Sequence, residues 1–381
     1  MDQWESSLSG KTNHQKDGYN FVKSSFARRS FMVKKSLFCW FLLSILLFTA
    51  CKSANPPETE TAEDSYAAIN AETYAANARI GRSVNLGNSL EGPREGAWGL
   101  YLTARYFEDI AAAGFDSVRV PIRWSSYTDI LEPYTIDDLI LERVDWVIEQ
   151  AFTNDLAVII NVHHFDAIML QPEDQAARLT AIWRQIAERY QDYPNTLYFE
   201  ILNEPNQSLT SEVWNQIFPE ALAAIRETNP ERYVIIGPDQ WNNINRLSTL
   251  ALPEDERRII VTFHYYLPHE FTHQGASWSS AANIKDKPWG SQGEIKALTD
   301  AFDAALRWSD QEQRPLFIGE FGTYNKAPMD SRVLWTSTVR AEAEKRGFSW
   351  AYWDFGTDFA VYNLATKEWR EPILQALIPA P

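Results

Sequence analysis

Eight short apolar runs, rich in β-branched residues and separated by longer amphipathic stretches, constrain the fold of this 381-residue chain more than any other feature. The runs predict strands at residues 81–88, 115–122, 156–163, 197–204, 232–238, 258–265, 315–321 and 348–354. Between them, residues 137–153 and 174–190 repeat apolar side chains at helical spacing. This alternation is typical of α/β proteins, and eight such units close into a (β/α)8 TIM barrel. The alternative is an open doubly wound sheet, but no Gly-x-Gly-x-x-Gly turn follows the first run.

The N-terminal segment has the three parts of an export signal. Two lysines precede an apolar run at residues 37–48, and small residues follow before Cys51. The run is too short for a comfortable membrane span. Its ending, Thr-Ala-Cys, resembles the bacterial lipobox, which implies that Cys51 is lipidated and anchors the protein in the periplasm or at the cell surface. The alternative is an ordinary signal peptide with an accidental cysteine. Met32 is well placed as the natural start.

The rest of the chain divides into two parts. Residues 52–69 contain few large apolar side chains and predict a flexible tether. Residues 70–381 contain the eight runs and predict a single barrel domain with catalytic function. Both cysteines, Cys39 and Cys51, lie in the export segment, so the barrel domain has no disulfide and no cysteine ligand for a metal.

The charge balance limits the partners. There are 35 Lys and Arg against 51 Asp and Glu, a formal net charge of −16. An acidic chain is unsuited to phosphate backbones, so we expect no nucleic-acid partner and favour uncharged ligands. Aromatic residues make up 13% of the chain and include 15 Trp, enough to supply stacking surfaces besides a core. We expect a monomer that contacts the membrane only through its N-terminal lipid.

Two glutamates follow predicted strands of the barrel. Glu204 ends the fourth run, in Asn-Glu-Pro, and Glu320 ends the seventh, in Gly-Glu-Phe-Gly. The carboxyl ends of barrel strands form one rim, where barrel enzymes place their chemistry. Two carboxyls across such a mouth suit a retaining glycosidase, which needs them about 5 Å apart. Taken singly, each glutamate fits a helix cap or an ion pair equally well.

Glu200 is the rival acid on the fourth run. It shares the side-chain parity of Glu204 on an extended strand but lies four residues deeper. We therefore interpret Glu200 as a buried, paired structural carboxylate.

An ordered set of motifs resembles glycoside hydrolase family 5, the cellulase family, and in particular its bacterial endoglucanase and mannanase-like members. The resemblance extends over nearly the whole chain after residue 80. Besides Asn203-Glu204-Pro205 and Gly319-Glu320-Phe321-Gly322, the set comprises Asn85-Leu-Gly-Asn88-Ser-Leu-Glu91, Val118-Arg119-Val-Pro121, Asn161-Val-His163-His164, Phe263-His264-Tyr265-Tyr266, the loop Phe271 to Trp278, and Trp350 to Phe355.

The resemblance implies that Glu204 is the acid/base and Glu320 the nucleophile of a double displacement without a cofactor. Arg119 would keep Glu320 ionised, because a neighbouring cation lowers a carboxyl pKa. Tyr266 would donate its hydroxyl to Glu320. Asn203 is suited to hold the 2-hydroxyl of the sugar.

The remaining motif residues are assigned to supporting and binding roles. Adjacent side chains on a strand face opposite ways, so His163 is expected on the catalytic floor and His164 at the rim. His264 supports the catalytic pair. Trp353 is expected to form the platform under the sugar at the cleavage point. The other candidates for substrate binding are Asn88, Glu91, Trp241, His273 and Trp278.

Several alternatives stay open at this point. The histidines suggest a zinc site, but no His-x-His lies on the first run and no cysteine ligand exists, so we expect no metal. A non-catalytic glycan-binding lipoprotein would keep the aromatic cleft, yet such barrels usually lose a catalytic carboxylate, and both remain here. The substrate is a β-linked polysaccharide or oligosaccharide: β-1,4-glucan, β-mannan or both. A strict β-mannanase is the alternative within the enzyme class.

Overall fold

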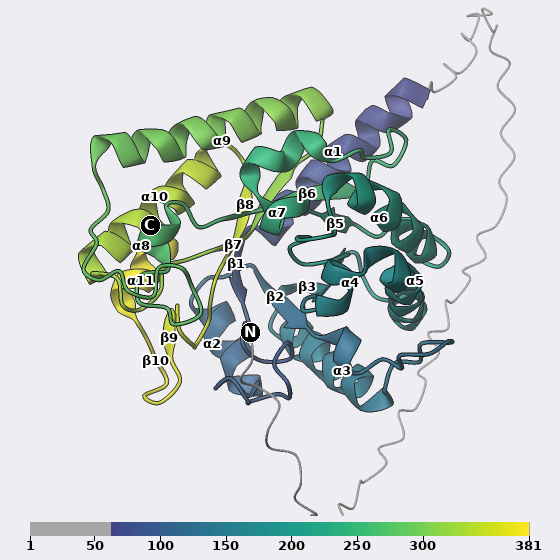
Figure 1. The fold of residues 1–381 in the computed structure, drawn as a ribbon, viewed down its shortest axis with the longest axis horizontal. Helices are drawn as coiled ribbons and strands as arrows, with labels where there is room; N and C mark the ends of the chain where they lie inside the picture. Colours follow the sequence, from purple (N-terminus) through teal and green to yellow (C-terminus); the bar gives the residue numbers. More distant parts are fainter. Residues whose placement is uncertain (1–61, 381) are drawn as a thin grey trace, which may run out of the picture. The chain divides into compact units, whose positions relative to one another are not determined.

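The computed structural model describes residues 62–380 (Figure 1). Contacts divide the chain after Glu58, and every described residue lies in the second unit, Thr59–Pro381. The predicted export signal, the lipidated Cys51 and the alternative start at Met32 lie outside the described residues. Among the helices that the structure describes, none is both long enough and apolar enough to span a membrane.

Eight parallel strands form a closed barrel in sequence order, and β1 pairs with both β2 and β8. The predicted (β/α)8 barrel is confirmed. The strands are β1 Arg82–Asn85, β2 Ser117–Ile122, β3 Ala157–Val162, β4 Leu197–Glu200, β5 Val234–Ile236, β6 Ile259–Tyr265, β7 Leu316–Phe321 and β8 Ser349–Tyr352. Each of the eight predicted runs contains a strand, and every strand is shorter than its run. β9 Tyr362–Asn363 and β10 Glu368–Trp369 form a separate antiparallel pair.

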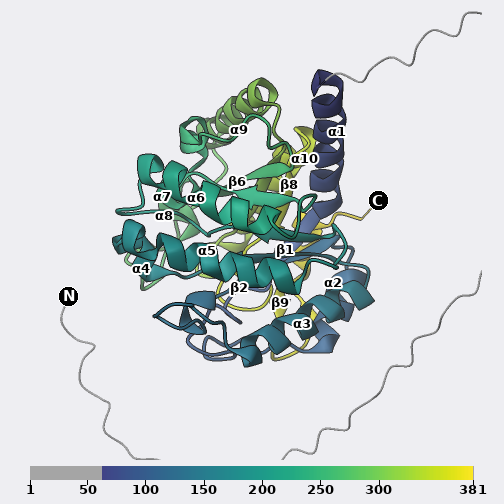
Figure 2. The same cartoon turned by 90° about the vertical axis from the view of Figure 1, so that its right-hand side faces the viewer.

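Helices surround the barrel, and α5 and α6 pack against each other (Figure 2). They are α2 Ala104–Ala112, α3 Asp138–Thr153, α4 Asp166–Leu170, α5 Pro172–Arg189, α6 Ser211–Arg226, α7 Asp239–Asn242, α8 His269–Thr272, α9 Gln292–Glu312, α10 Met329–Lys345 and α11 Glu371–Leu377, with 3₁₀ turns η1 Trp124–Ser126 and η2 Ile244–Thr249. Local sequence fixes several ends. The Asp137 carboxylate accepts from the Leu139 amide at the start of α3, and Ser291 with Glu294 forms a capping box on α9.

Side chains that point into the barrel change character along the strands. Near the amino ends, Ile159, Tyr198, Ile260 and Phe317 pack together as an apolar layer. Toward the carboxyl ends of the strands, polar residues take their place, among them Asn85, Arg119, Glu200 and Glu320. Burying these groups is unfavourable unless each finds a partner, so this polar layer specifies a fixed network rather than loose packing.

Helix α1, Ala62–Ile80, covers the amino end of the barrel and corrects the predicted tether. Ala76 and Ile80 pack into the apolar layer, and the Asn77 amide donates to the Leu316 carbonyl over 3.0 Å. The tether was expected to run to residue 69, but α1 already begins at Ala62. Its sequence is rich in alanine, which favours helix, and burial of its last turns against the barrel stabilises it.

Candidate active site

A cleft of about 1270 Å³ opens at the carboxyl end of the barrel. Of the predicted site residues within the barrel domain, all but Arg119 line it: Asn88, Glu91, His163, His164, Asn203, Glu204, Trp241, His264, Tyr266, His273, Trp278, Glu320 and Trp353. It is also lined by residues that the sequence did not single out: Trp98, Gln240, Asn243, Ile244, Leu267, His269, Ser279, Ser280, Asp358 and Phe359. The lining contains no Lys or Arg but four acidic residues, so the cleft does not suit an anionic ligand.

A bulge in β7 directs Glu320 into the barrel. Phe263 pairs with Ile318, but the next residue, His264, pairs with Glu320, so Gly319 is the extra residue on β7. Because side chains alternate along a strand and Phe317 already points inward, regular pairing would have turned Glu320 toward the helices. Glycine at the bulge avoids a clash, since a Cβ there would lie 2.7 Å from Thr262 Oγ1 and would force a neighbouring side chain to move.

Two donors hold the Glu320 carboxylate. Arg119 Nη1 donates to Oε1 over 2.8 Å, and the Tyr266 hydroxyl donates to Oε2 over 2.9 Å, the contact expected from the sequence. Burial raises the pKa of Glu320, while His264 and Arg119 act in the opposite direction. Arg119 thus favours the ionised form as expected, but burial is the larger influence.

Arg119 is completely buried, and all five of its N–H donors have partners. Its Nε and Nη2 form a bidentate pair with Glu200 over 2.6 and 2.7 Å. This confirms Glu200 as a buried, paired carboxylate. The other donors reach Glu320, Asn85 Oδ1 and Asn203 Oδ1, both amide oxygens at 2.8 Å. The guanidinium therefore fixes the Asn203 amide as well as the Glu320 carboxylate.

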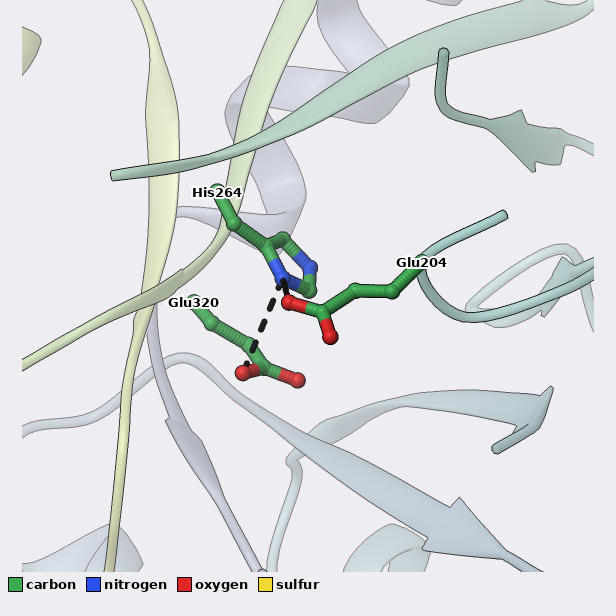
Figure 3. A group of neighbouring side chains, drawn as sticks. All are labelled: Glu204, His264 and Glu320. Carbon is green, nitrogen blue, oxygen red and sulfur yellow. Dashed lines mark hydrogen bonds and ion pairs between the residues drawn. The ribbon is translucent and has the colours of Figure 1, made fainter. Parts of the chain in front are cut away.

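Glu204 reaches the cleft from beyond the strand. β4 ends at Glu200, and Glu204 has φ 49°, so the expectation that both lie on one extended strand is wrong. The Asn206 amide donates to the Glu204 carbonyl over 2.7 Å and holds the left-handed turn. His264 Nδ1 lies 2.7 Å from Glu204 Oε1 (Figure 3). A quarter of the Glu204 side chain is exposed, at 25%, but protein surrounds the rest, and burial raises its pKa to about 7.

Glu204, His264 and Glu320 converge closely, with one donor atom from each lying within 4.8 Å of the others (Figure 3). One oxygen of Glu204 and one oxygen of Glu320 therefore lie within 4.8 Å of each other. For comparison, retaining glycosidases hold their two carboxyls about 5 Å apart. Three such groups resemble a cation site, but Arg119 and Tyr266 already occupy the Glu320 oxygens, and His264 is engaged with Glu204. A fixed guanidinium beside them opposes a metal ion.

Trp353 directly follows β8 and is partly exposed at the bottom of the cleft. Its indole stacks on the His163 ring, with centroids 5.7 Å apart and planes 7° apart. A Cβ at Gly87 would lie 2.8 Å from this indole, so glycine there lets the ring lie against the segment that follows β1. His163 is almost completely buried and the neighbouring His164 is partly exposed, but both follow the end of β3 at Val162, so alternation along the strand is not the reason for the difference.

Three exposed tryptophans arise from different loops. Trp98, Trp241 and Trp278 are 42%, 55% and 61% exposed and follow β1, β5 and β6 respectively. Trp98 was not predicted from the sequence, although its position in the short glycine-flanked loop after Glu91 indicated an exposed aromatic side chain near the site. His273 stacks on His269 with centroids 4.1 Å apart, and burial lowers its pKa to about 3, so its imidazole is neutral.

Asn88 and Glu91 shape one wall of the cleft. The Asn88 amide donates to Asp354 over 3.2 Å and to the Thr357 hydroxyl over 2.5 Å. The Glu91 carboxyl accepts from the backbone amides of Asn88 and Ser89. Burial raises the pKa of Glu91 to about 8, so the side chain is mostly neutral at pH 7 and is able to donate a hydrogen bond.

Comparison with known proteins identifies the family. Residues 80–358 match the family described as Cellulase (glycosyl hydrolase family 5). Endoglucanase B of Clostridium cellulovorans is 32% identical over 325 residues, which cover 77% of this chain and 72% of that protein. The chain belongs to glycosyl hydrolase family 5. This family 5 chain is therefore a glycoside hydrolase, and the family resemblance in its motifs is confirmed.

Two further comparisons concern this family 5 chain. Endoglucanase H of Acetivibrio thermocellus is 39% identical over 305 residues, which are 78% of this chain but only 33% of that protein. The chain thus spans about a third of that relative. The structure of endoglucanase Cel5A from Thermotoga maritima superposes with a TM-score of 0.79 at 46% identity, covering 80% of this chain and 99% of that one. Structures of that Cel5A contain cellobiose and mannotriose.

Proposed function

We propose that this protein is a retaining endo-β-1,4-glycanase that hydrolyses β-glucan and β-mannan. The observation that carries the proposal is the approach of Glu204 and Glu320, together with His264, to within 4.8 Å at the mouth of the barrel. Their surroundings differ in the way the two roles require. Glu320 accepts from a guanidinium and a hydroxyl, whereas Glu204 has a pKa raised to about 7.

In the first step, Glu320 attacks the anomeric carbon while Glu204 protonates the departing glycosidic oxygen. In the second, Glu204 takes a proton from water as the water attacks the glycosyl–Glu320 ester. Forming the ester removes the charge of Glu320, which lowers the pKa of Glu204 and lets one residue perform both tasks. Asn203, whose carbonyl is held by Arg119, directs its amide N–H groups to the 2-hydroxyl of the sugar.

The cleft supports an uncharged β-linked polymer. Trp353 offers a flat surface beside both carboxylates, and Trp98, Trp241 and Trp278 extend the aromatic surface outward. The complexes of the related Cel5A with cellobiose and mannotriose support acceptance of both glucose and mannose units. Hydrolysis of carboxymethyl cellulose, barley glucan, a pure β-1,4-mannan, glucomannan and xyloglucan, compared side by side, tests this breadth. Activity on mannan alone would identify a strict mannanase and contradict the proposal.

Rescue by azide tests the two catalytic roles separately. In Glu320→Gly, azide replaces the missing nucleophile and should release an α-glycosyl azide from an activated aryl β-glycoside. In Glu204→Ala, the intermediate still forms from such a substrate, and azide should capture it as the β-azide. General acid/base assistance contributes typically about 10²–10⁴-fold, so this variant should lose at least that factor on polysaccharide. Exchanged stereochemistry would reverse the two roles, and full activity of either variant would contradict the mechanism.

We also propose that the protein is an exported lipoprotein anchored through Cys51. The proposal rests on the apolar run and the lipobox-like residues before this cysteine. Mass spectrometry of the membrane-extracted protein should show a diacylglycerol adduct on Cys51. A mature protein that begins elsewhere and carries no lipid would contradict it.

A further inference from the structure

Three consecutive residues without glycine adopt left-handed backbone conformations in the loop after β5. Gln240, Trp241 and Asn242 have φ values of 54°, 62° and 52°. Such residues persist in this region only where contacts from the rest of the structure hold them, and the strain often serves a site. The contacts of Trp241 and Asn242 lead to the segment that bears Glu204 and to His264, its partner.

The turn holds Glu204 through its backbone and through a neighbouring side chain. The Trp241 amide donates to the carbonyl of Pro205, the residue after Glu204, over 3.1 Å. Asn243 forms an isolated β-bridge with His264, the partner of Glu204. Between these two contacts, the completely buried Asn242 places its side-chain Nδ2 3.2 Å from His264 Nε2. A side chain at Gly237 would overlap the Asn242 amide, so the fit is tight.

We propose that Asn242 is a positioning residue that fixes His264 in the tautomer whose Nδ1–H donates to Glu204. An amide nitrogen only donates, so His264 Nε2 must accept, and a neutral imidazole then carries its single proton on Nδ1. That nitrogen lies 2.7 Å from Glu204 Oε1. This inference rests on the proposed role of Glu204 as the acid/base.

The chain of contacts restricts where Glu204 carries its catalytic proton. With Oε1 accepting from His264, the proton is confined to Oε2, the oxygen left for the leaving group. If Nε2 carried the imidazole proton instead, Nδ1 would face Oε1 as an acceptor and would attract the Glu204 proton. Protonation of the leaving group by Glu204 would then compete with a hydrogen bond from Glu204 to His264. The donor character of Asn242 thus keeps the proton available to substrate.

His264 stays neutral while Glu204 titrates, so the position of its single ring proton decides how it contacts Glu204. Burial lowers the pKa of His264 to about 4 and raises that of Glu204 to about 7, so the imidazole is neutral throughout the range in which Glu204 titrates. The titratable groups that act on the pair are Arg119, His163, Glu200, Tyr266 and Glu320. None of these needs to change for Asn242 to act, so substitution at Asn242 isolates its effect.

Asn242→Asp tests the proposal because it keeps the size and the tolerance of left-handed backbone but replaces the donor with an acceptor. His264 should then be protonated at Nε2. Nitrogen-15 NMR of the histidine rings reads this directly, since the chain has six histidines and a His264→Gln variant identifies the signals. Wild-type protein should show an unprotonated Nε2 on His264, and Asn242→Asp should show a protonated one. Asn242→Gly, which keeps the turn and removes the amide, provides a second variant if the first does not fold.

The kinetic effect should depend on the leaving group. We expect kcat/KM of Asn242→Asp on β-glucan to fall at least about 10-fold, a part of the general-acid contribution. On dinitrophenyl β-cellobioside, which needs little protonation, the change should stay within about 3-fold. In this variant Nδ1 of His264 attracts the Glu204 proton, and the imidazolium formed in this way should favour ionised Glu204 and move the alkaline limb of the pH profile down by about one unit. Asn245→Asp, the same change at an exposed position three residues away, is the matched control and should behave as wild type.

A protonated Nε2 on His264 of the wild-type protein would overturn the proposal, and so would an unchanged tautomer and pH profile in both Asn242 variants. Equal losses on the two substrates would also overturn it, because they indicate a general structural defect. Wild-type protein inactive on every β-glycan would instead reject the proposed function, while the NMR result on His264 would still stand.

Discussion

Replacing the Glu204 carboxyl with an amide should abolish hydrolysis and at the same time stabilise the fold. Burial raises the pKa of Glu204 from 4.5 to about 7, so the folded protein disfavours the charged form. Each pKa unit corresponds to about 1.4 kcal/mol. Native protein should therefore lose about 3 kcal/mol of stability at this site as the pH rises from 4.5 through 7, because the unfolded chain ionises there first. Glu204→Gln removes that loss.

The gain in Glu204→Gln should consequently depend on pH. Below pH 4.5 the carboxyl is neutral in both states, and the variant should match wild type. Above pH 7 it should be more stable by about 3 kcal/mol, which for a domain of this size raises Tm by about 4 °C. Thermal unfolding at pH 4 and pH 8, followed by circular dichroism, measures the difference. Glu142→Gln, the same change on an exposed residue of α3, should shift stability by less than about 0.5 kcal/mol at either pH.

Glu200→Gln should show the opposite behaviour, because Glu200 forms the buried bidentate pair with Arg119. Breaking such a pair costs about 3–5 kcal/mol. These predictions would be contradicted by a Glu204→Gln variant that is no more stable than wild type at pH 8, or whose gain in stability is the same at pH 4 as at pH 8. So would a Glu200→Gln variant of unchanged stability.

Three further outcomes follow from the geometry of the site. Trp353→Ala should cut turnover sharply while lowering stability by no more than about 3 kcal/mol, as for a partly exposed aromatic, in steady-state kinetics and thermal unfolding. Tyr266→Phe removes a hydrogen bond to the Glu320 carboxylate, and such a bond to a charged acceptor is worth about 1.5–3 kcal/mol. Its loss should raise the pKa of Glu320, so the acidic limb of the pH–activity profile should move to higher pH and kcat should fall at least about 10-fold. Gly319→Ala should fold but lose activity, because its Cβ would press on Thr262 beside the bulge; wild-type kinetics would show that the bulge tolerates a side chain.

The polar rim of the barrel could be predicted from sequence, although the strand ends themselves were placed up to four residues too late, because apolar runs mark the strands and the chemistry lies where these runs stop. Glu320 and Trp353 lie at or directly after such ends. Hydrophobic periodicity reports local burial, which is also why α3, predicted at residues 137–153, agrees with the structure at both ends to within a residue. The tether was misjudged at α1 for the converse reason. Its few large apolar residues did not reveal a helix that packs through alanine and a single isoleucine.

Contacts between distant segments were the part that sequence could not supply. Asn242 and His264 are 22 residues apart and meet only because β5 and β6 are neighbours in the barrel. No local sequence pattern marks Asn242, because its effect depends on the contact with His264 in another segment and not on the hydrophobic periodicity around it. Trp98 is different: its loop was visible, but only the folded cleft shows that this loop and the one bearing Trp278 line the same cavity.

Short-range patterns of burial in the sequence predicted the number of βα units and the rim on which the polar residues gather, and the family motifs singled out Glu204 and Glu320 at that rim. The way in which those carboxylates face each other depends on contacts between strands that form only in the folded barrel. The bulge at Gly319 turns Glu320 inward, and the left-handed backbone of Glu204 carries its side chain off the line of β4. Both are departures from regular strand geometry, stabilised by side chains from other strands. The alternation of side chains along a single strand therefore does not predict either of them.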